Sequence, residues 1–212
     1  MIAISTAYKE ALIGIKIKDK EICTTLDSNC KHSENLLKTI DEKLSEINYS
    51  FKDNKTMAVV IGPGSFTGLR ISISLIKGLY CGSPFKIIPI TTFELLAYSY
   101  VKHNSPKEDF CCIINALSGY FYKCCFNKNG VKIGQEELID SSQLKEIKID
   151  IVGLKEDELF DQTISPTAEE LLQLALIKEK NDEFLSDLNN LIPLYLRKSQ
   201  AEDALEQKIK NS

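Results

Sequence analysis

The sequence is poor in the residue patterns that build metal centres. It has only two histidines, His32 and His103, which are too far apart in the chain to form the H-x-x-x-H pair of a helical metal site. It has seven cysteines but no C-x-x-C spacing, which excludes the common zinc-ribbon and thioredoxin motifs. The vicinal pairs at 111–112 and 124–125 fall in apolar, strand-like runs, so we expect buried, reduced thiols and no metal site.

Long uncharged runs are also missing. No stretch of the length needed to cross a bilayer is free of charge, and the N-terminus lacks the charged-then-apolar plan of a secretory signal. The net charge of −4 argues against a broad basic face that grips nucleic acid by itself. With 212 residues, 43% of them hydrophobic, the chain can bury a sizeable core. These features predict a cytoplasmic globular protein without membrane contact.

The most distinctive stretch is Gly62–Arg70, which reads G-P-G-S-F-T-G-L-R between an apolar run and a segment with helical spacing. A helix start leaves amide groups unpaired, so an anion, a hydroxyl cap or another chain must satisfy them. The stretch matches neither a Walker A loop, nor a dinucleotide fingerprint, nor a nucleophile elbow. Capping by Ser65 or Thr67 and binding of an anion or nucleotide are equal hypotheses. The binding candidates are Gly62, Gly64, Ser65, Thr67, Gly68 and Arg70.

Hydrophobic periodicity predicts one pattern of elements that occurs twice. The first half reads as strands over 2–7, 11–18 and 21–26, a helix over 32–47, a strand over 57–61, a helix after Gly68, a strand over 85–90 and a helix over 92–103. The second half reads as strands over 110–115, 119–126, 131–138 and 149–152 and a helix over 167–180.

The repeated order of three strands, helix, strand and helix indicates an α/β protein with a duplicated RNase H-like fold of the actin/Hsp70 type, in two βββαβα halves. The polar segment 104–109 separates them. We expect an N-terminal half over 1–104, a C-terminal half over 105–192, and a C-terminal helix over 193–212 that packs back on the first half.

The Gly62–Arg70 string resembles the signature of the TsaB (YeaZ) family. Three further segments resemble that family: Lys31–Leu37, Lys77–Leu79 and Pro193–Arg197. The resemblance implies a non-catalytic scaffold that pairs with TsaD, and with the ATPase TsaE, in the transfer of threonylcarbamoyl to N6 of adenosine 37 in tRNA. The chain would then contact tRNA only through the complex. It would carry no cofactor of its own, with ATP or ADP at the complex interface.

In this family the helix over 32–47 and the helix after Gly68 contact TsaD. The resemblance therefore assigns an interface to His32, Leu36, Leu37, Ile40, Phe66, Leu69, Arg70 and Ile73. The alternative is that roughly half of these residues belong to the core. A homodimer of the isolated chain through the same surface stays open, as does the direction in which Arg70 faces.

The sequence departs from the family at two acidic positions. Where relatives carry Asp-Thr-Ser after the first strand, this chain has Ser5-Thr6-Ala7, and where they carry Asp-Ala-Arg it has Asn115-Ala116-Leu117. Neither Ser5 nor Asn115 can ionise to orient a metal-bound water or act as a base, so we expect no catalytic residue. Two alternatives remain: an ATPase-like enzyme that uses the Gly62–Arg70 loop, and a protease-like hydrolase in which His32 would serve Ser65.

Overall fold

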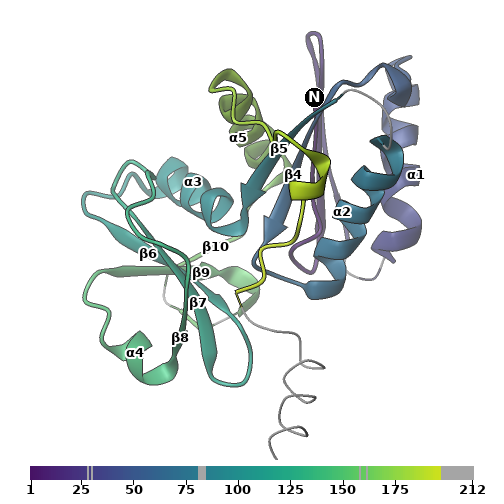
Figure 1. Cartoon of the computed structure of the whole chain (residues 1–212). Coiled ribbons are helices and arrows are strands. Elements are labelled where there is room, and N and C mark those ends of the chain that lie inside the picture. Colours follow the sequence, from purple (N-terminus) through teal and green to yellow (C-terminus); the bar gives the residue numbers. More distant parts are fainter. Residues whose placement is uncertain (28, 30, 81–84, 158, 161, 197–212) are drawn as a thin grey trace, which may run out of the picture.

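Figure 1 shows the computed structural model of the chain, which describes residues 1–27, 29, 31–80, 85–157, 159–160 and 162–196. In these residues the strands form two five-stranded sheets. The first sheet has the order β3-β2-β1-β4-β5. Its strands are β1 (Ile2–Ser5), β2 (Ala11–Ile17), β3 (Lys20–Leu26), β4 (Thr56–Gly62) and β5 (Lys86–Thr91). β2 is antiparallel to β1 and β3, whereas β4 is parallel to β1 and β5.

The second sheet repeats this topology. Its order is β10-β9-β6-β7-β8, with antiparallel β6–β7 and β7–β8 pairs and parallel β6–β9 and β9–β10 pairs. The strands are β6 (Phe110–Asn115), β7 (Tyr120–Phe126), β8 (Glu137–Asp140), β9 (Asp150–Leu154) and β10 (Gln162–Ile164). Read from β8 to β10, each strand takes the place of its counterpart in the first sheet. The predicted duplicated RNase H-like fold is confirmed.

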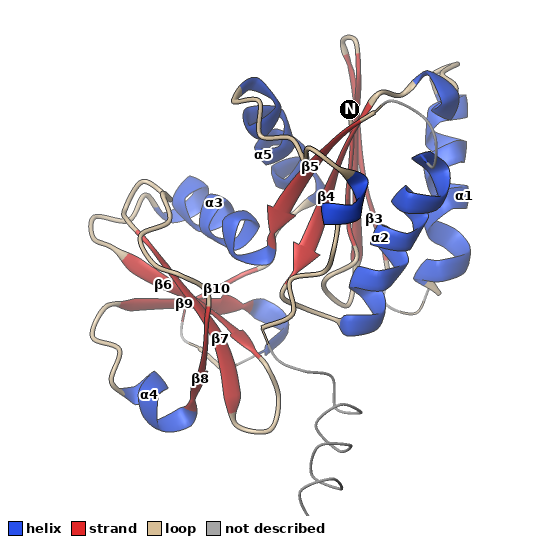
Figure 2. Cartoon of the chain, viewed as in Figure 1, coloured by secondary structure: helices blue, strands red, loops and turns tan. Residues whose placement is uncertain are grey.

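Helices cover both faces of the first sheet (Figure 2). On one face, α1 (His32–Glu46) and α2 (Phe66–Tyr80) pack on the isoleucines of β1 and β2. On the other face lie α3 (Thr92–Asn104) and α5 (Ala168–Lys180). Side chains alternate along a strand. Ile2 and Ile4 therefore enter the core beneath α1 and α2, while Ala3 enters the core beneath α3 and α5. α5 follows the second sheet in sequence but packs on β1 and β2, so the two halves interlock.

The second half keeps the strand order but shortens the helices. The helix after its third strand is α4 (Ser141–Lys145), which has 5 residues against 15 in α1. Between β9 and β10 the described residues contain a single 3₁₀ turn, η2 (Lys155–Asp157). The remaining short elements are the 3₁₀ turns η1 (Phe51–Asp53) and η3 (Leu188–Asn190). In the part of the chain that is described, no helix has the length and apolarity that crossing a membrane requires.

The strand predicted over 131–138 is wrong for most of its length, since β8 starts at Glu137. The side chain of Asn127 accepts hydrogen bonds from the amides of Asn129 (3.0 Å) and Val131 (3.0 Å). This turn directs the chain away from β7 after a single β-bridge between Phe126 and Lys132. The sequence reasoning also missed α4 and β10.

After α5 the chain returns to the first half. The amide of Leu185 donates to the carbonyl of Ile87 (2.8 Å), and the amide of Leu194 donates to the carbonyl of Ile61 (2.7 Å). Between them, Leu191 is buried in the core beneath α1 and α2. The C-terminal helix that the sequence predicts over 193–212 would start in this returning segment. Residues 193–196 are irregular, and 197–212 lie outside the described residues.

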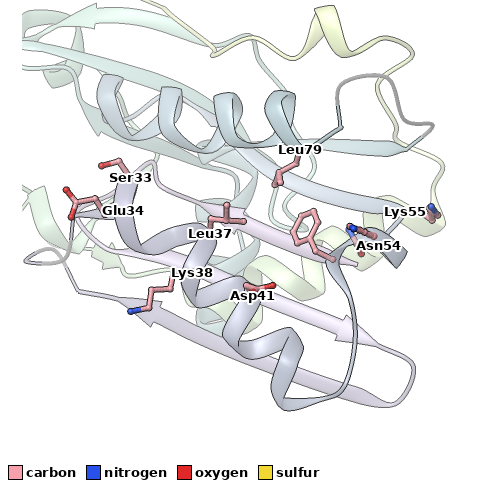
Figure 3. Close-up of a pocket in the computed structure, with 10 residues that line it drawn as sticks. Ser33, Glu34, Leu37, Lys38, Asp41, Asn54, Lys55 and Leu79 are labelled. Atoms are coloured by element: carbon pink, nitrogen blue, oxygen red, sulfur yellow. The ribbon is translucent and has the colours of Figure 1, made fainter.

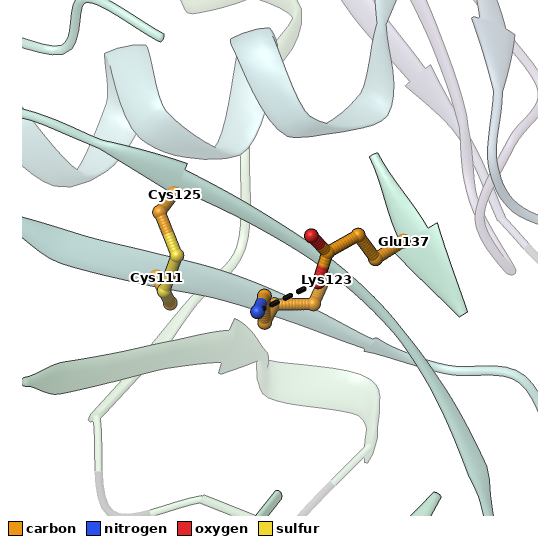
Figure 4. The surroundings of a disulfide bond; sticks show 4 residues. All are labelled: Cys111, Lys123, Cys125 and Glu137. Carbon is orange, nitrogen blue, oxygen red and sulfur yellow. Dashed lines mark ion pairs between the residues drawn. A yellow bond between two sulfur atoms is a disulfide. The ribbon is translucent and has the colours of Figure 1, made fainter. Parts of the chain in front are cut away.

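Two cysteine pairs face each other across β6 and β7. Cys111 lies opposite Cys125 and Cys112 lies opposite Cys124. The sulfurs of Cys111 and Cys125 form a disulfide (Figure 4), which corrects the expectation of reduced thiols at these two positions. Cys112 and Cys124 are free and buried, as expected. The spacing of vicinal cysteines could not reveal the pairing, because it depends on the register between two strands.

One buried carboxylate joins α3 to α5. Glu170 accepts hydrogen bonds from the Ser99 hydroxyl (2.8 Å) and the Thr167 amide (3.0 Å), and its other oxygen lies 2.5 Å from Nε2 of His103. Burial opposes ionisation of Glu170, but the hydrogen bonds from Thr167, Ser99 and His103 outweigh it. The pKa of Glu170 therefore lies below its ordinary value. The ionised form stabilises the junction between the halves.

We predict that Glu170 makes the protein sensitive to acid. Because its pKa is lower in the folded than in the unfolded chain, its stabilisation is present above the unfolded pKa, near about 4.3, and is lost as the pH falls through the folded pKa. Circular-dichroism melts at decreasing pH should show a steeper loss of Tm for the wild type than for Glu170→Gln. Glu169→Gln, at an exposed neighbour, should keep the wild-type slope. Equal slopes for all three would contradict this role.

Candidate functional site

The glycine loop between β4 and α2, residues 62–68, is hydrogen-bonded to the residues that follow β1. The amide of Ser65 donates to the carbonyl of Ala7 (2.9 Å), and the hydroxyl of Thr6 donates to the carbonyl of Gly68 (2.6 Å). The amide of Gly68 donates in turn to the hydroxyl of Ser65 (3.2 Å). Capping of α2 by Ser65 is therefore confirmed.

Close backbone packing explains the glycines of this loop. A Cβ added to Gly68 would lie 1.9 Å from the carbonyl oxygen of Thr6, and one added to Gly64 would lie 2.5 Å from that of Ala7. Gly62 has a φ of +113°, which favours glycine. The binding of an anion by Gly62, Gly64, Ser65, Thr67, Gly68 and Arg70 stays a prediction. The closest contacts of Gly64 and Gly68 run to Ala7 and Thr6, the residues that follow β1.

A cavity of about 620 Å³ lies between the two halves, next to this loop. The segments after β1 and β6 line it, together with the loop, Asp157 and Tyr195. Ser5 is buried beside it, with its hydroxyl 3.4 Å from the amide of Ala7, whereas Asn115 reaches the cavity wall. Asp157 is a carboxylate that the sequence reasoning missed, because it follows β9 in no recognisable motif.

Asp157 is held by the backbone of the opposite strand end. Its Oδ2 accepts a hydrogen bond from the amide of Asn115 (3.3 Å). Burial raises the pKa of Asp157, and the Asn115 hydrogen bond and the charge of Lys9 partly offset the effect. Within the described residues no three His, Cys, Asp or Glu side chains come together as metal ligands. The ATPase-like alternative would therefore depend on Asp157 as its carboxylate in this cavity.

The hydrolase alternative lacks its central contact. Nε2 of His32, at the start of α1, is buried and makes no hydrogen bond to any described residue. The hydroxyl of Ser65 accepts from Gly68 instead. A serine nucleophile needs a base within hydrogen-bond reach, and His32 and Ser65 do not form that pair.

Arg70 faces outward beside an aromatic stack. The ring of Phe66 stacks on Tyr195 with centroids 5.0 Å apart, and Cζ of Arg70 lies 5.2 Å from the centroid of Phe66. All three side chains are exposed. Glu94, the intramolecular partner considered for Arg70, instead bonds Thr91 and Lys178.

An open groove of about 900 Å³ runs along α1 and reaches the end of α2. Leu37 of α1, Leu79 of α2 and Phe51 of η1 give it apolar walls. Figure 3 shows Leu37 and Leu79 facing the space between the two helices. Charged residues surround them: Glu34, Lys38, Asp41, Lys52 and Lys55. A partly exposed apolar centre within a charged rim is typical of protein interfaces.

The structure divides the predicted interface residues into two groups. Leu36, Ile40, Leu69 and Ile73 are at most 4% exposed, so they are core residues of this chain and cannot contact a partner in this conformation. Leu37 and Phe66 are 41% and 42% exposed, Arg70 is exposed, and His32 is half-buried. The i, i+4 spacing of Leu36 and Ile40 selects the stripe that faces the sheet, whereas Leu37 lies outside it.

Known proteins share this fold and sequence pattern. The family model described as TsaD, tRNA N6-adenosine threonylcarbamoyltransferase, matches residues 27–167. A Buchnera aphidicola (subsp. Acyrthosiphon pisum) protein named tRNA threonylcarbamoyladenosine biosynthesis protein TsaB is 27% identical over 190 residues, covering 87% of this chain and 84% of that protein. The protein of the same name from Escherichia coli K12 is 29% identical over 108 residues, or 50% of this chain and 46% of that one.

A solved structure has the same overall fold. YeaZ from Pseudomonas aeruginosa superimposes with a TM-score of 0.75 at 21% sequence identity, covering 92% of this chain and 98% of that one. The topology thus defines a duplicated α/β protein of the YeaZ type. The chain belongs to the TsaD family and, within it, to the TsaB (YeaZ) group.

We predict that Gly68→Ala destabilises the protein strongly, because its new methyl group would overlap the backbone carbonyl of Thr6. The expected loss is more than about 2 kcal/mol in chemical denaturation. The matched control is Gly78→Ala on the same helix, where an added Cβ meets nothing within 4 Å. That variant should be neutral or up to about 1 kcal/mol more stable. Similar losses at both positions would contradict the packing role of Gly68.

Proposed function

We propose that this chain is a non-catalytic subunit in the synthesis of threonylcarbamoyladenosine at position 37 of tRNA, and that it acts by binding TsaD. The TsaB name of relatives that match most of the chain supports the pathway. The groove along α1 and α2 supports the mode of action. This groove, with Leu37 at its centre, is the observation that carries the proposal.

The groove has the properties of a docking site for a helix. Leu37 is 41% exposed on a helix whose neighbouring apolar residues, Leu36 and Ile40, are buried. Leu37 lies beside Phe51 and Leu79. A partner that covers it removes apolar surface from water, and this burial favours binding. Apolar side chains of a partner helix would fill the groove, and the charged rim would fix its orientation.

The cavity between the halves supports the absence of catalysis by this chain. Ser5 and Asn115 stand where the family resemblance leads us to expect acidic residues, and the hydroxyl of Ser65 is engaged as a helix cap. Asp157 accepts a hydrogen bond from the backbone amide of Asn115, and the charged group that acts on it is the ammonium of Lys9. The threonylcarbamoyl transfer to N6 of adenosine 37 would take place on TsaD. TsaE and tRNA would bind to the assembled pair in the cytoplasm, with ATP or ADP at the complex interface.

We predict that Leu37→Asp strongly weakens the interaction with TsaD from the same organism. A charge placed in the centre of an apolar interface should weaken binding at least about 30-fold, or roughly 2 kcal/mol, in isothermal titration calorimetry. The variant should melt like the wild type, because Leu37 lies outside the core.

The matched control is Ile177→Asp. Ile177 is 44% exposed, but it lies on α5, on the opposite face of the first sheet. This variant should bind TsaD with wild-type affinity. Loss of binding in both variants, or in neither, would contradict docking at the groove. Light scattering of the isolated chain would show whether Leu37→Asp also dissociates a homodimer.

A further inference from the structure

The charges that line the groove along α1 and α2 differ between its two ends. Figure 3 shows Ser33 and Glu34 at one end of the groove and Asn54 and Lys55 at the other. Lys52 also lines the groove, and it belongs to η1, the turn just before Lys55. A partner that lies along the groove therefore meets an acidic side chain at one end and two lysines at the η1 end.

The chain itself neutralises the end that holds Glu34. Lys31 forms an ion pair with Glu34 at 3.0 Å. Lys52 and Lys55 are exposed, and within the described residues their ammonium groups form no ion pair. The positive charge at the η1 end is therefore available to carboxylates of a partner.

Acidic side chains reduce this positive charge on the groove wall but do not cancel it. Asp41 lines the groove from α1, is exposed, and forms no ion pair among the described residues. Asp53 follows Lys52 in η1, but it is not one of the described residues that line the groove. Lys38, the remaining charged residue of the wall, pairs with Glu42 at 3.9 Å. Of the unpaired charges on the described wall, two are ammonium groups and one is a carboxylate.

The backbone that carries the two lysines is held in one shape. In η1 the amide of Asp53 donates to the carbonyl of Ser50 (3.0 Å), and the amide of Asn54 donates to that of Phe51 (3.0 Å). The side-chain amide of Asn54 donates to the carbonyl of Thr56 (2.9 Å), and Phe51 packs against the core beneath α1 and α2. Binding through these lysines therefore has to order side chains but no backbone, which lowers its entropic cost.

We propose that the groove accepts an acidic segment of its partner, whose carboxylates pair with Lys52 and Lys55 while its apolar side chains cover Leu37. This inference rests on the proposed docking of TsaD and adds the chemistry of the surface that docks. Closure of the interface removes water from beside the ammonium groups, and their attraction to carboxylates strengthens as the local dielectric constant falls. An RNA backbone fits less well, because it needs cations along its whole path and the centre of this groove is apolar.

The two kinds of contact act on different rate constants. Charges at the rim of an interface chiefly raise the rate of association, because they attract the partner before contact. Apolar contacts at the centre chiefly slow dissociation. Lys52 and Lys55 therefore govern how fast the partner arrives, whereas Leu37 governs how long it stays.

The test measures binding rates of the full chain to TsaD from the same organism by surface plasmon resonance at low salt. The double variant Lys52→Glu with Lys55→Glu should associate at least about 10-fold more slowly, with a dissociation rate within about 3-fold of the wild type. The difference should shrink at about 0.5 M salt, which screens exposed charges. Asp41→Asn should have the opposite effect and associate faster, because it removes a charge that repels the acidic partner.

The matched control is Lys107→Glu with Lys180→Glu. It changes the net charge by the same amount at two exposed positions, one between the halves and one on α5, on the opposite face of the first sheet. This variant should associate like the wild type. An equal slowing in both double variants would overturn the proposal, because it would reflect net charge and not the groove.

Carbodiimide cross-linking of the complex, which joins amines to carboxylates in contact, gives a second readout. Mass spectrometry should find Lys52 or Lys55 joined to an aspartate or glutamate of TsaD. Unchanged association of the Lys52 and Lys55 variant, with weak binding of Leu37→Asp, would overturn this inference and leave the docking of TsaD in place. No binding by the wild type would overturn both. A variant that binds TsaD normally but loses affinity for tRNA would assign the lysines to RNA and overturn the acidic partner.

Discussion

The rest of the structure depends on the contact between the glycine loop and the end of β1. Gly68 lies so close to the carbonyl of Thr6 that no side chain fits between them, and Ser65 bonds the backbone of Ala7. This contact fixes where α2 begins and how it crosses the first sheet. The position of α2 then sets the groove that it shares with α1, and the loop forms one wall of the cavity between the halves. The unusual composition of Gly62–Arg70 is thus a packing requirement before it is a binding feature.

The two halves repeat one topology but divide their tasks. The first half carries long helices, an apolar core on both faces of its sheet, and the groove. The second half supplies α5, which packs across the first sheet and is joined to α3 through Glu170. Its own outer face has the short α4, and a small separate cluster that contains Cys111 is buried there. The second half thus keeps the strand order of the first with much shorter helices.

Strong local patterns predicted most of the fold. The strand over 110–115 and the start of α1 at His32 agree with the structure, because apolar periodicity decides both. The sequence could not predict α4 and β10, which are too short to show a period. It also could not separate Leu36 from Leu37 as core and surface, since both fit an apolar helix and the sheet alone decides which is covered. Asp157 and the disulfide escaped notice because each depends on contacts between segments that are distant in the sequence.

The central claim, that the groove along α1 and α2 is the surface that binds TsaD, is tested most directly by hydrogen–deuterium exchange. The full chain is measured alone and with an excess of TsaD from the same organism. The account predicts slower exchange in α1, η1 and the second half of α2, with no change in α5 on the opposite face of the first sheet. Protection confined to α5, or to the cavity between the halves, would contradict it.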